Sequence, residues 1–392
     1  MIPFDSFHIL VVGAGPAGGR AAAAAASAGV PTLLIDAKSR IGEQPHCGEF
    51  VPRRFFTEFG ISTDCIVQPV SRMETRVTNP SALSTSAGDR MGHSRYPRPG
   101  GSFDSSGHAE ISAGTEEKVS TDSPGYTIDR PRLDRSLARE AAAAGATVLS
   151  AAGLVRREND CWVLRSDGRE VTTRPSVVIA ADGALSTVAS LLGMRRPEVL
   201  LGVQVEAPLA QPQAGTFVFL DPRIVGGYGW LFPKGNTANV GIGMEPGSGT
   251  APRRVLDAML ETIAGLGLIR PGRLARSSGV IAVSGLRRDL VVGNVILCGD
   301  AAGLTHPITG AGVPQAAFSG HLAGVSAAAA VKSGDGKYLH DYELEIRGRY
   351  AGILGHALAK RRVMKSKWRD PDFSATCKQT WIAFKEYRKR VR

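Results

Sequence analysis

The sequence has little of what would mark a secreted, metal-binding or membrane-spanning protein. Its 392 residues include five cysteines, widely scattered and without a CxxC pair, so they indicate neither a zinc site nor a disulfide framework. No run of about 18 uncharged apolar residues occurs, and no transmembrane helix is expected. The N-terminus lacks the basic region, apolar core and cleavage site of a secretory signal. Together these absences predict a cytoplasmic protein.

Basic charge is unevenly distributed and gathers at the C-terminus. The formal net charge is +11, and residues 360–392 contain 12 basic but only three acidic side chains. Within residues 378–392 the large apolar side chains recur near one helical stripe: Trp381, Phe384, Tyr387 and Val391. Such a basic amphipathic helix predicts peripheral contact with the inner face of an anionic membrane, although a terminal helix packed on its own domain fits the pattern equally well. No nucleic-acid-binding module accompanies the charge, so nucleic acid is not expected as a partner.

Short apolar runs and glycine turns alternate along the chain in the pattern of an α/β protein. Buried strands are expected at residues 7–12, 177–180 and 291–297, and further strands at 32–35 and 147–149. Helices are expected after the glycine turn to about residue 27, at 133–144, and after residue 312 to the end. Residues 162–173 predict a β-hairpin, and residues 201–244 alternate as an antiparallel sheet does. Residues 83–119, rich in Ser, Gly, Pro and charge, are expected to form a long excursion.

This pattern predicts a Rossmann-type nucleotide-binding domain with an inserted antiparallel β-sheet domain and a helical C-terminal region. The nucleotide-binding domain is discontinuous, at residues 1–70, 125–195 and 285–330. A β-rich substrate domain takes residues 71–124 and 196–284, and residues 331–392 form the basic helical region.

A glycine motif at residues 13–18 (GAGPAG) follows the first strand and opens a helix. Gly13 permits the tight turn, Gly15 lets the backbone approach a pyrophosphate, and Gly18 allows close packing of helix on strand. Asp36 ends the second strand, where its carboxylate can accept hydrogen bonds from ribose hydroxyls. The spacing of turn, helix and acid predicts a dinucleotide site.

Two later motifs favour FAD over NAD. Asp182 in residues 180–183 (AADG) and Asp300 in residues 298–302 (CGDAA) each follow a predicted strand. Asp300 can accept a hydrogen bond from a ribityl hydroxyl, and the helix that starts near Gly312 can direct N–H groups at the flavin. A plain NAD dehydrogenase has no use for an acid so far along the chain. Asp182 is expected at the cofactor, or else caps its own helix.

The glycine, DG and GD motifs resemble those of the glutathione-reductase-type FAD superfamily, which includes aromatic hydroxylases. Within that superfamily the chain most resembles the geranylgeranyl reductase family. The segments that carry this resemblance are residues 42–49 (GEQPHCGE), 128–134, 227–235 (GYGWLFPKG), 239–243 (NVGIG) and 299–312. The chain departs from the family at His46 and Phe50, where the family usually has Arg and Gly.

The resemblance implies which residues contact FAD: Ala17, Asp36, Cys47, Gly48, Arg130, Leu154, Asp300, Gly312 and Val313. Arg130 suits this role because its guanidinium fork can bind a phosphate through two hydrogen bonds. The alternatives are that Arg130 is a surface arginine at the start of a helix and that Leu154 is an ordinary core residue.

Members of the resembled family reduce isolated carbon–carbon double bonds of polyprenyl chains. Because such an alkene is unactivated, hydride from the flavin must be coupled to proton delivery, which calls for a positioned acid. Cys47 is the candidate, although cysteines are also among the most commonly buried residues. The resemblance implies a substrate cavity lined by Tyr228, Trp230 and Phe232, which alternate along one predicted strand and could equally be a core sheet face. Pro307 is expected beside them.

The single dinucleotide motif suggests that the reductant binds transiently, either as NAD(P)H or as a ferredoxin-like electron-donor protein. The leading hypothesis is reduction of an isoprenoid double bond in a hydrophobic or lipid substrate. A flavin monooxygenase acting on an aromatic or peptidyl aromatic substrate, and a flavoprotein with an accessory role, remain the alternatives because fold analogy does not separate them.

Overall fold

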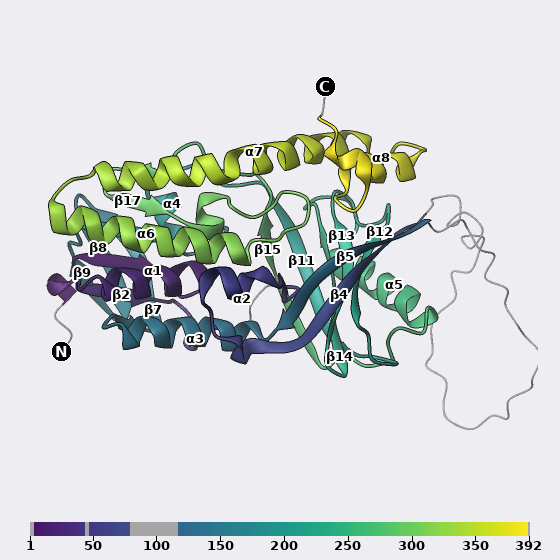
Figure 1. Ribbon diagram of the computed structural model, residues 1–392, viewed down its shortest axis with the longest axis horizontal. Coiled ribbons are helices and arrows are strands. Elements are labelled where there is room, and N and C mark those ends of the chain that lie inside the picture. The colour runs from purple at the N-terminus through teal and green to yellow at the C-terminus, as the bar shows by residue number, and fades with distance from the viewer. Residues whose placement is uncertain (1–3, 44–46, 79–116, 391–392) are drawn as a thin grey trace, which may run out of the picture.

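The computed structural model describes residues 4–43, 47–78 and 117–390. A parallel sheet flanked by helices lies beside a larger twisted sheet, and the long helix α7 (Lys337–Lys367) runs past both (Figure 1). The chain therefore has the predicted α/β architecture.

The nucleotide-type sheet has six strands in the order β16-β17-β10-β1-β2-β6. Their bounds are Ile9–Val12 (β1), Thr32–Ile35 (β2), Thr147–Leu149 (β6), Val177–Ala180 (β10), Val291–Val292 (β16) and Val295–Leu297 (β17). The first four were expected at these places. The single strand expected over 291–297 is instead an antiparallel pair, because the chain turns at Gly293, whose φ is 59°.

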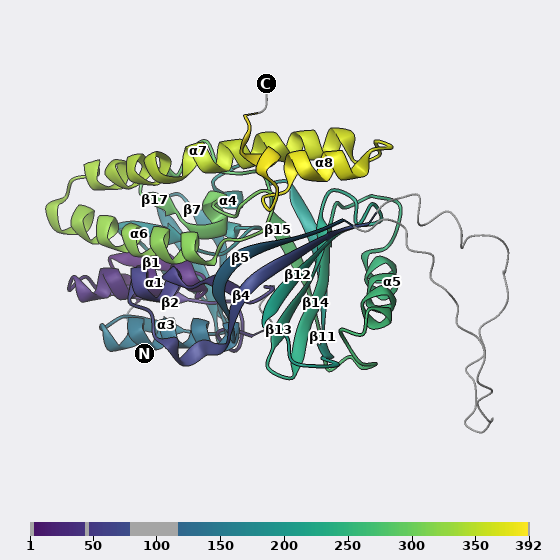
Figure 2. The ribbon, with the colours of Figure 1, turned by 45° about the vertical axis from the view of Figure 1, so that its right-hand side comes forward.

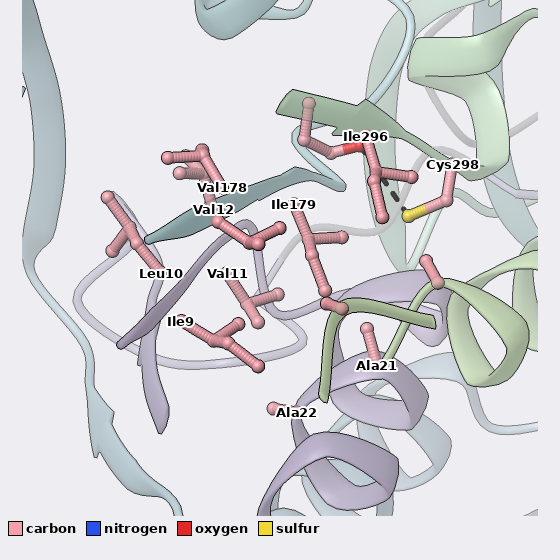
Figure 3. Packing of buried hydrophobic residues seen from close by; sticks show 14 of the residues in the cluster. Ile9, Leu10, Val11, Val12, Ala21, Ala22, Val178, Ile179, Ile296 and Cys298 are labelled. Atoms are coloured by element: carbon pink, nitrogen blue, oxygen red, sulfur yellow. Dashed lines mark hydrogen bonds between the residues drawn. The ribbon is translucent and has the colours of Figure 1, made fainter. Parts of the chain in front are cut away.

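The central strands of this sheet are buried on both faces, which explains why β1, β10 and β17 contain only apolar residues. Residues 9–12 and 177–180 are all buried. Ile9, Val11 and Ile179 point toward Ala21 and Ala22 of α1 (Pro16–Ser27), as Figure 3 shows, and Leu10 and Val178 point to the other face. Cys298 is fully buried in the same cluster.

Two helices approach each other closely on one face of this sheet. α1 lies against α6 (Val313–Ser333), and a Cβ atom added to Gly320 of α6 would come within 2.0 Å of the Ala17 carbonyl oxygen. At Gly324 the same construction gives 2.2 Å to the Ala21 carbonyl oxygen. The absence of side chains at these glycines therefore sets the distance between the helices.

The second sheet has eight strands in the order β15-β11-β14-β13-β12-β4-β5-β3. Their bounds are Phe50–Pro52 (β3), Ile66–Val77 (β4), Glu117–Ile128 (β5), Val199–Pro208 (β11), Gly215–Leu220 (β12), Tyr228–Lys234 (β13), Thr237–Met244 (β14) and Ala275–Ala282 (β15). One face packs on α5 (Pro252–Gly265) and the other on the C-terminal segment (Figure 2). The antiparallel pairing predicted within residues 201–244 is present. At the edge of this stretch, β12 pairs with β4 in parallel.

The smaller elements complete the chain. Their bounds are Arg54–Phe59 (α2), Arg130–Ala143 (α3), Thr187–Leu191 (α4), Phe373–Thr380 (α8), and Ala152–Glu158, Cys161–Ser166 and Arg169–Thr173 (β7, β8 and β9). The expected hairpin is β8–β9. The domain boundary expected after residue 70 falls inside β4, and β3 also joins the larger sheet. Of the excursion expected over 83–119, residues 83–116 lie outside the described residues.

The amphipathic helix expected over residues 378–392 is wrong for the described residues 378–390, and Val391 lies outside them. α8 ends at Thr380, Trp381 is extended, and a short 3-10 turn follows at Lys385–Arg388. Trp381 and Phe384 are only 1% and 6% exposed, because they pack on the protein's own sheet and helices. Tertiary contacts thus determine the conformation of this segment and override its local helical pattern. Among the described helices, none is long and apolar enough to span a membrane.

The close contact of α1 with α6 predicts that a Gly→Ala substitution changes the free energy of unfolding in opposite directions in α6 and in α7. Gly320→Ala should lower the free energy of unfolding by about 1–3 kcal/mol, because the new methyl group overpacks against Ala17. Gly348→Ala in α7, where an added Cβ meets nothing within 4 Å, should instead raise it by about 0.5–1 kcal/mol. Urea unfolding of both variants measures this, and equal effects would contradict the packing argument.

Candidate functional site

The glycine turn after β1 has the geometry of a phosphate-binding loop. Gly13 has a φ of 97°, and a Cβ atom there would come within 2.5 Å of the Ala181 carbonyl oxygen. Gly15 faces open space, with nothing within 4 Å of an added Cβ, whereas at Gly18 such an atom would lie 1.7 Å from the Gly13 carbonyl oxygen. The three glycines therefore supply the turn, the open approach and the close packing expected of them.

Asp36 is held beside this turn. Its Oδ2 accepts a hydrogen bond from the Ala14 backbone N–H at 2.8 Å, and its Oδ1 accepts one from the Lys38 N–H at 2.9 Å. The Asp36 carbonyl oxygen accepts from the N–H of Ala152, which brings β7 and its half-buried Leu154 to the same end of the sheet. Fixed in this way, the Asp36 carboxylate borders the open space at Gly15.

Asp182 serves its own helix in this structure. Its Oδ1 accepts from the Ser186 hydroxyl at 2.5 Å, and its Oδ2 accepts from the Val188 N–H at 3.1 Å. Burial raises the pKa of the Asp182 carboxyl. Its backbone nevertheless lies against Gly13. The geometry thus matches the capping alternative, and a cofactor contact through the Asp182 side chain stays a prediction.

Asp300 and the start of α6 face each other. The Thr305 hydroxyl donates to Asp300 Oδ1 at 2.6 Å, and a Cβ atom on Gly312 would come within 3.0 Å of the same oxygen. No side chain among the described residues caps α6, so the positive end of its dipole, with the N–H groups of Val313 and Gln315, is not met by a side chain. Burial raises the pKa of the Asp300 carboxyl.

These features fit one FAD molecule. The turn at residues 13–18 and the N-terminus of α1 suit its pyrophosphate, and Asp36 suits the adenosine ribose. Asp300 and the uncapped N-terminus of α6, which begins with Val313, suit the ribityl and flavin end. Ala17 lies between them, its methyl group 3.0 Å from a Cβ atom added to Gly299.

A large cavity adjoins the start of α6. Its volume is about 660 Å³, and its wall combines the larger sheet with α2, α6, α7 and the C-terminal segment. Tyr228, Trp230 and Phe232 of β13 all line it, as does Cys47. Pro307 does not, because it is buried and turned toward Arg361, whose guanidinium donates to the Pro307 carbonyl oxygen. Its neighbours His306 and Thr309 line the cavity instead.

Cys47 lies where the cavity meets the predicted flavin end of the site. Its Sγ accepts a hydrogen bond from the Glu49 N–H at 3.2 Å, and the Arg130 side chain is within hydrogen-bonding reach. Burial raises the pKa of the thiol despite the opposing charge of Arg130. The thiol is therefore protonated at neutral pH, as a proton donor must be.

Arg130 is engaged by a protein carboxylate. Its guanidinium donates to both oxygens of Asp134, at 3.1 and 3.2 Å from one nitrogen, and this pair is almost fully buried. The charge of Arg130 is thus directed at Asp134 and Cys47. The phosphate contact expected of Arg130 stays a prediction.

Sequence reasoning missed two residues of this site. Glu49 is buried with partners from several elements, and its only signal was its place after Cys47 in the segment 42–49. Trp381 lines the cavity with its ring 4.8 Å from that of Tyr228. No local signal points to Trp381, because more than 150 residues separate it from Tyr228. His46, which the sequence placed beside Cys47, lies outside the described residues.

The comparisons with known proteins agree with this geometry. Residues 6–354 match the FAD binding domain family. A digeranylgeranylglycerophospholipid reductase of Methanocella arvoryzae is 31% identical, over 92% of this chain and 87% of that protein. A geranylgeranyl bacteriochlorophyll reductase-like protein from Thermoplasma acidophilum superimposes with a TM-score of 0.78 at 26% identity, over 97% of this chain and 92% of that chain.

An aklavinone-11 hydroxylase shares only the fold, with a TM-score of 0.65 at 18% identity, over 95% of this chain and 71% of that one. The fold and the site define the chain as an FAD-dependent oxidoreductase. Within that class it belongs to the geranylgeranyl reductase family, as the segments around Cys47, Trp230 and Asp300 indicated.

The arrangement around Asp300 predicts its effect on flavin binding. Asp300→Asn should weaken the affinity for FAD by about tenfold to a hundredfold, since a hydrogen bond to a charged group contributes about 1.5–3 kcal/mol. Titration of the apoprotein followed by flavin fluorescence measures this. Asp64→Asn, an exposed position in another part of the chain, is the matched control, and equal affinities in the two variants would refute the assignment.

Proposed function

We propose that this protein reduces carbon–carbon double bonds of a polyprenyl substrate of the geranylgeranyl type. The observation that carries the proposal is a protonated thiol, Cys47, on the wall of an aromatic-lined cavity that adjoins the FAD site. The related proteins named as reductases of geranylgeranyl lipids support the same substrate class.

The cavity suits a long apolar chain. Its lining includes Phe50, Phe55, Phe59 and Val218 besides the three aromatic residues of β13. It extends to the protein surface, where Ile353 of α7 and Ile382 are 61% and 37% exposed although both belong to its lining. Exposed apolar side chains at such an opening favour entry of a hydrophobic molecule.

The residues around Cys47 suit general acid catalysis. Reduced FAD, which the turn at residues 13–18, Asp36 and Asp300 would hold, would supply hydride for one alkene carbon. Cys47 donates its proton to the other carbon, so that the double bond gains two hydrogens. Burial keeps the thiol protonated beforehand, and Arg130 stabilises the thiolate that forms.

The electron donor in this proposal binds transiently. The glycine turn at residues 13–18 is the only dinucleotide motif in the sequence, and the FAD site uses it. NAD(P)H or a ferredoxin-like protein would therefore reduce the flavin without a lasting site of its own. Contact with a membrane surface, from which a lipid substrate would be taken up, remains part of the proposal.

An anaerobic single-turnover experiment tests the reaction. Chemically reduced holoenzyme mixed with a geranylgeranyl lipid should yield a product that gains two hydrogens per flavin oxidised, measured by mass spectrometry. Substrate-stimulated oxygen consumption with a hydroxylated product would support an aromatic monooxygenase instead. If neither response occurs with geranylgeranyl lipids, the proposed reduction is wrong.

The role of Cys47 predicts both a rate and a pH profile. Cys47→Ser should keep its flavin but reduce the single-turnover rate about a hundredfold, the lower end of what general acids contribute. Because the pKa of the Cys47 thiol is raised, the wild-type rate should stay level through neutral pH and fall only above the ordinary thiol range of about 8.5. Stopped-flow measurement of flavin oxidation across pH provides both readouts.

Cys161→Ser is the matched control because Cys161 is a half-buried cysteine on β8, in the separate three-stranded sheet. It should behave as the wild type does. A Cys47→Ser variant with full activity, or a wild-type rate that already falls between pH 6 and 7, would rule out Cys47 as the proton donor.

A further inference from the structure

Glu49 is a buried acidic residue that the reaction described above does not use. It is 4% exposed and follows the half-buried loop residues Cys47 and Gly48. Its φ is 67°, in the left-handed region that a residue with a side chain seldom adopts. A strained backbone persists only when the surrounding contacts hold it there, and such strain clusters at functional sites.

The Glu49 carboxylate gathers donors from three separate elements. Its Oε2 accepts from Lys234 Nζ of β13 at 2.7 Å and from Asn239 Nδ2 of β14 at 2.6 Å. Its Oε1 accepts from the Arg130 N–H at the start of α3, at 2.9 Å. The Glu49 backbone continues the network, since its N–H donates to Cys47 Sγ and its carbonyl oxygen accepts from the Ile128 N–H.

These contacts hold the loop at one place on the sheet. Asn239 is the direct cross-strand partner of Phe232, and a Cβ atom on Gly48 would lie 2.6 Å from the Phe232 ring. Glu49 therefore binds the sheet where the loop already lies in contact with an aromatic residue of the cavity wall. A shift of the carboxylate would move Cys47 relative to that wall.

We propose that Glu49 is a positioning residue, which holds the Cys47–Gly48 loop against β13 and β14 so that the Cys47 thiol faces the cavity. This inference rests on the proposed function for its catalytic consequence. The position of the thiol is a property of the protein itself and is measurable without turnover.

The charge of Glu49 also acts on the thiol it positions. Among the described residues, the titratable groups that face Cys47 are Arg130 from α3, Tyr228 from β13 and Glu49 from the same loop. Burial raises the pKa of Cys47 most, Arg130 lowers it, and Glu49 raises it. Loss of the carboxylate should thus lower the pKa of the thiol, whereas loss of a remote carboxylate should not.

Peptide-resolved alkylation of Cys47 by iodoacetamide, followed across pH in the purified holoprotein, tests the inference. In Glu49→Gln the titration of Cys47 should move to lower pH and its alkylation at pH 8 should become severalfold faster, as the thiol loses its carboxylate neighbour and the loop loosens. The turnover number should fall about tenfold to a hundredfold, as expected for a misplaced catalytic group, with little change in KM.

Glu198→Gln is the matched control, because Glu198 also pairs with a lysine, Lys365, but on the exposed surface. It should leave both readouts unchanged. Asn239→Ala removes one donor to Glu49 but keeps the ion pair with Lys234, so it should accelerate alkylation of Cys47 to a smaller degree. If Glu49→Gln does not fold, this second variant tests the inference. Wild-type alkylation profiles in the Glu49→Gln or Asn239→Ala protein would overturn the inference. Absence of lipid reduction by the wild type, with altered alkylation in the variants, would instead overturn only the proposed function.

Discussion

The whole site depends on how closely backbones approach one another around the nucleotide-type sheet. Gly18 lets α1 lie directly on the Gly13 turn, and Gly320 lets α6 lie on α1. Because no side chain separates these segments, the N-termini of two helices open toward one ligand. Helix N-termini carry partial positive charge and unpaired N–H groups. The packing of small residues is thus what converts separate motifs into one FAD site.

A second constraint joins this site to the larger sheet. The loop that follows β2 leaves the nucleotide-type sheet and reaches β13 and β14, where Glu49 binds Lys234 and Asn239. The same loop carries Cys47 into the wall of the cavity. Buried charge pairs therefore hold together the predicted flavin end of the site, the Cys47 thiol and the aromatic wall of the cavity. Removing one partner of such a pair lowers the free energy of unfolding by more than the pair contributes in total, because the other charge is left buried without compensation.

The C-terminal segment shows how tertiary contacts override a local pattern. Its basic and apolar residues alternate as an amphipathic helix requires, but Trp381 packs against Tyr228 and donates to the Thr75 hydroxyl. Lys360 donates to the carbonyl oxygens of Gln379 in α8 and Glu386 in the 3-10 turn, and so joins these two separate elements. Trp381, one of the aromatic residues that suggested a membrane surface, thereby forms part of the cavity wall instead.

What the sequence determined by itself was local and periodic. Apolar runs such as residues 7–12 and 177–180 predicted buried strands, and the glycines at 13, 15 and 18 predicted the turn, because each effect acts over a few neighbouring residues. The sequence offered local partners for Asp182 and Arg130 but did not decide between these and the cofactor, and it did not indicate the distant partners of Glu49. Asp182 turns to Ser186, Arg130 to Asp134, and Glu49 to strands nearly 190 residues away. A polar side chain in an apolar interior takes the nearest donor or acceptor, and only the folded arrangement decides which one that is.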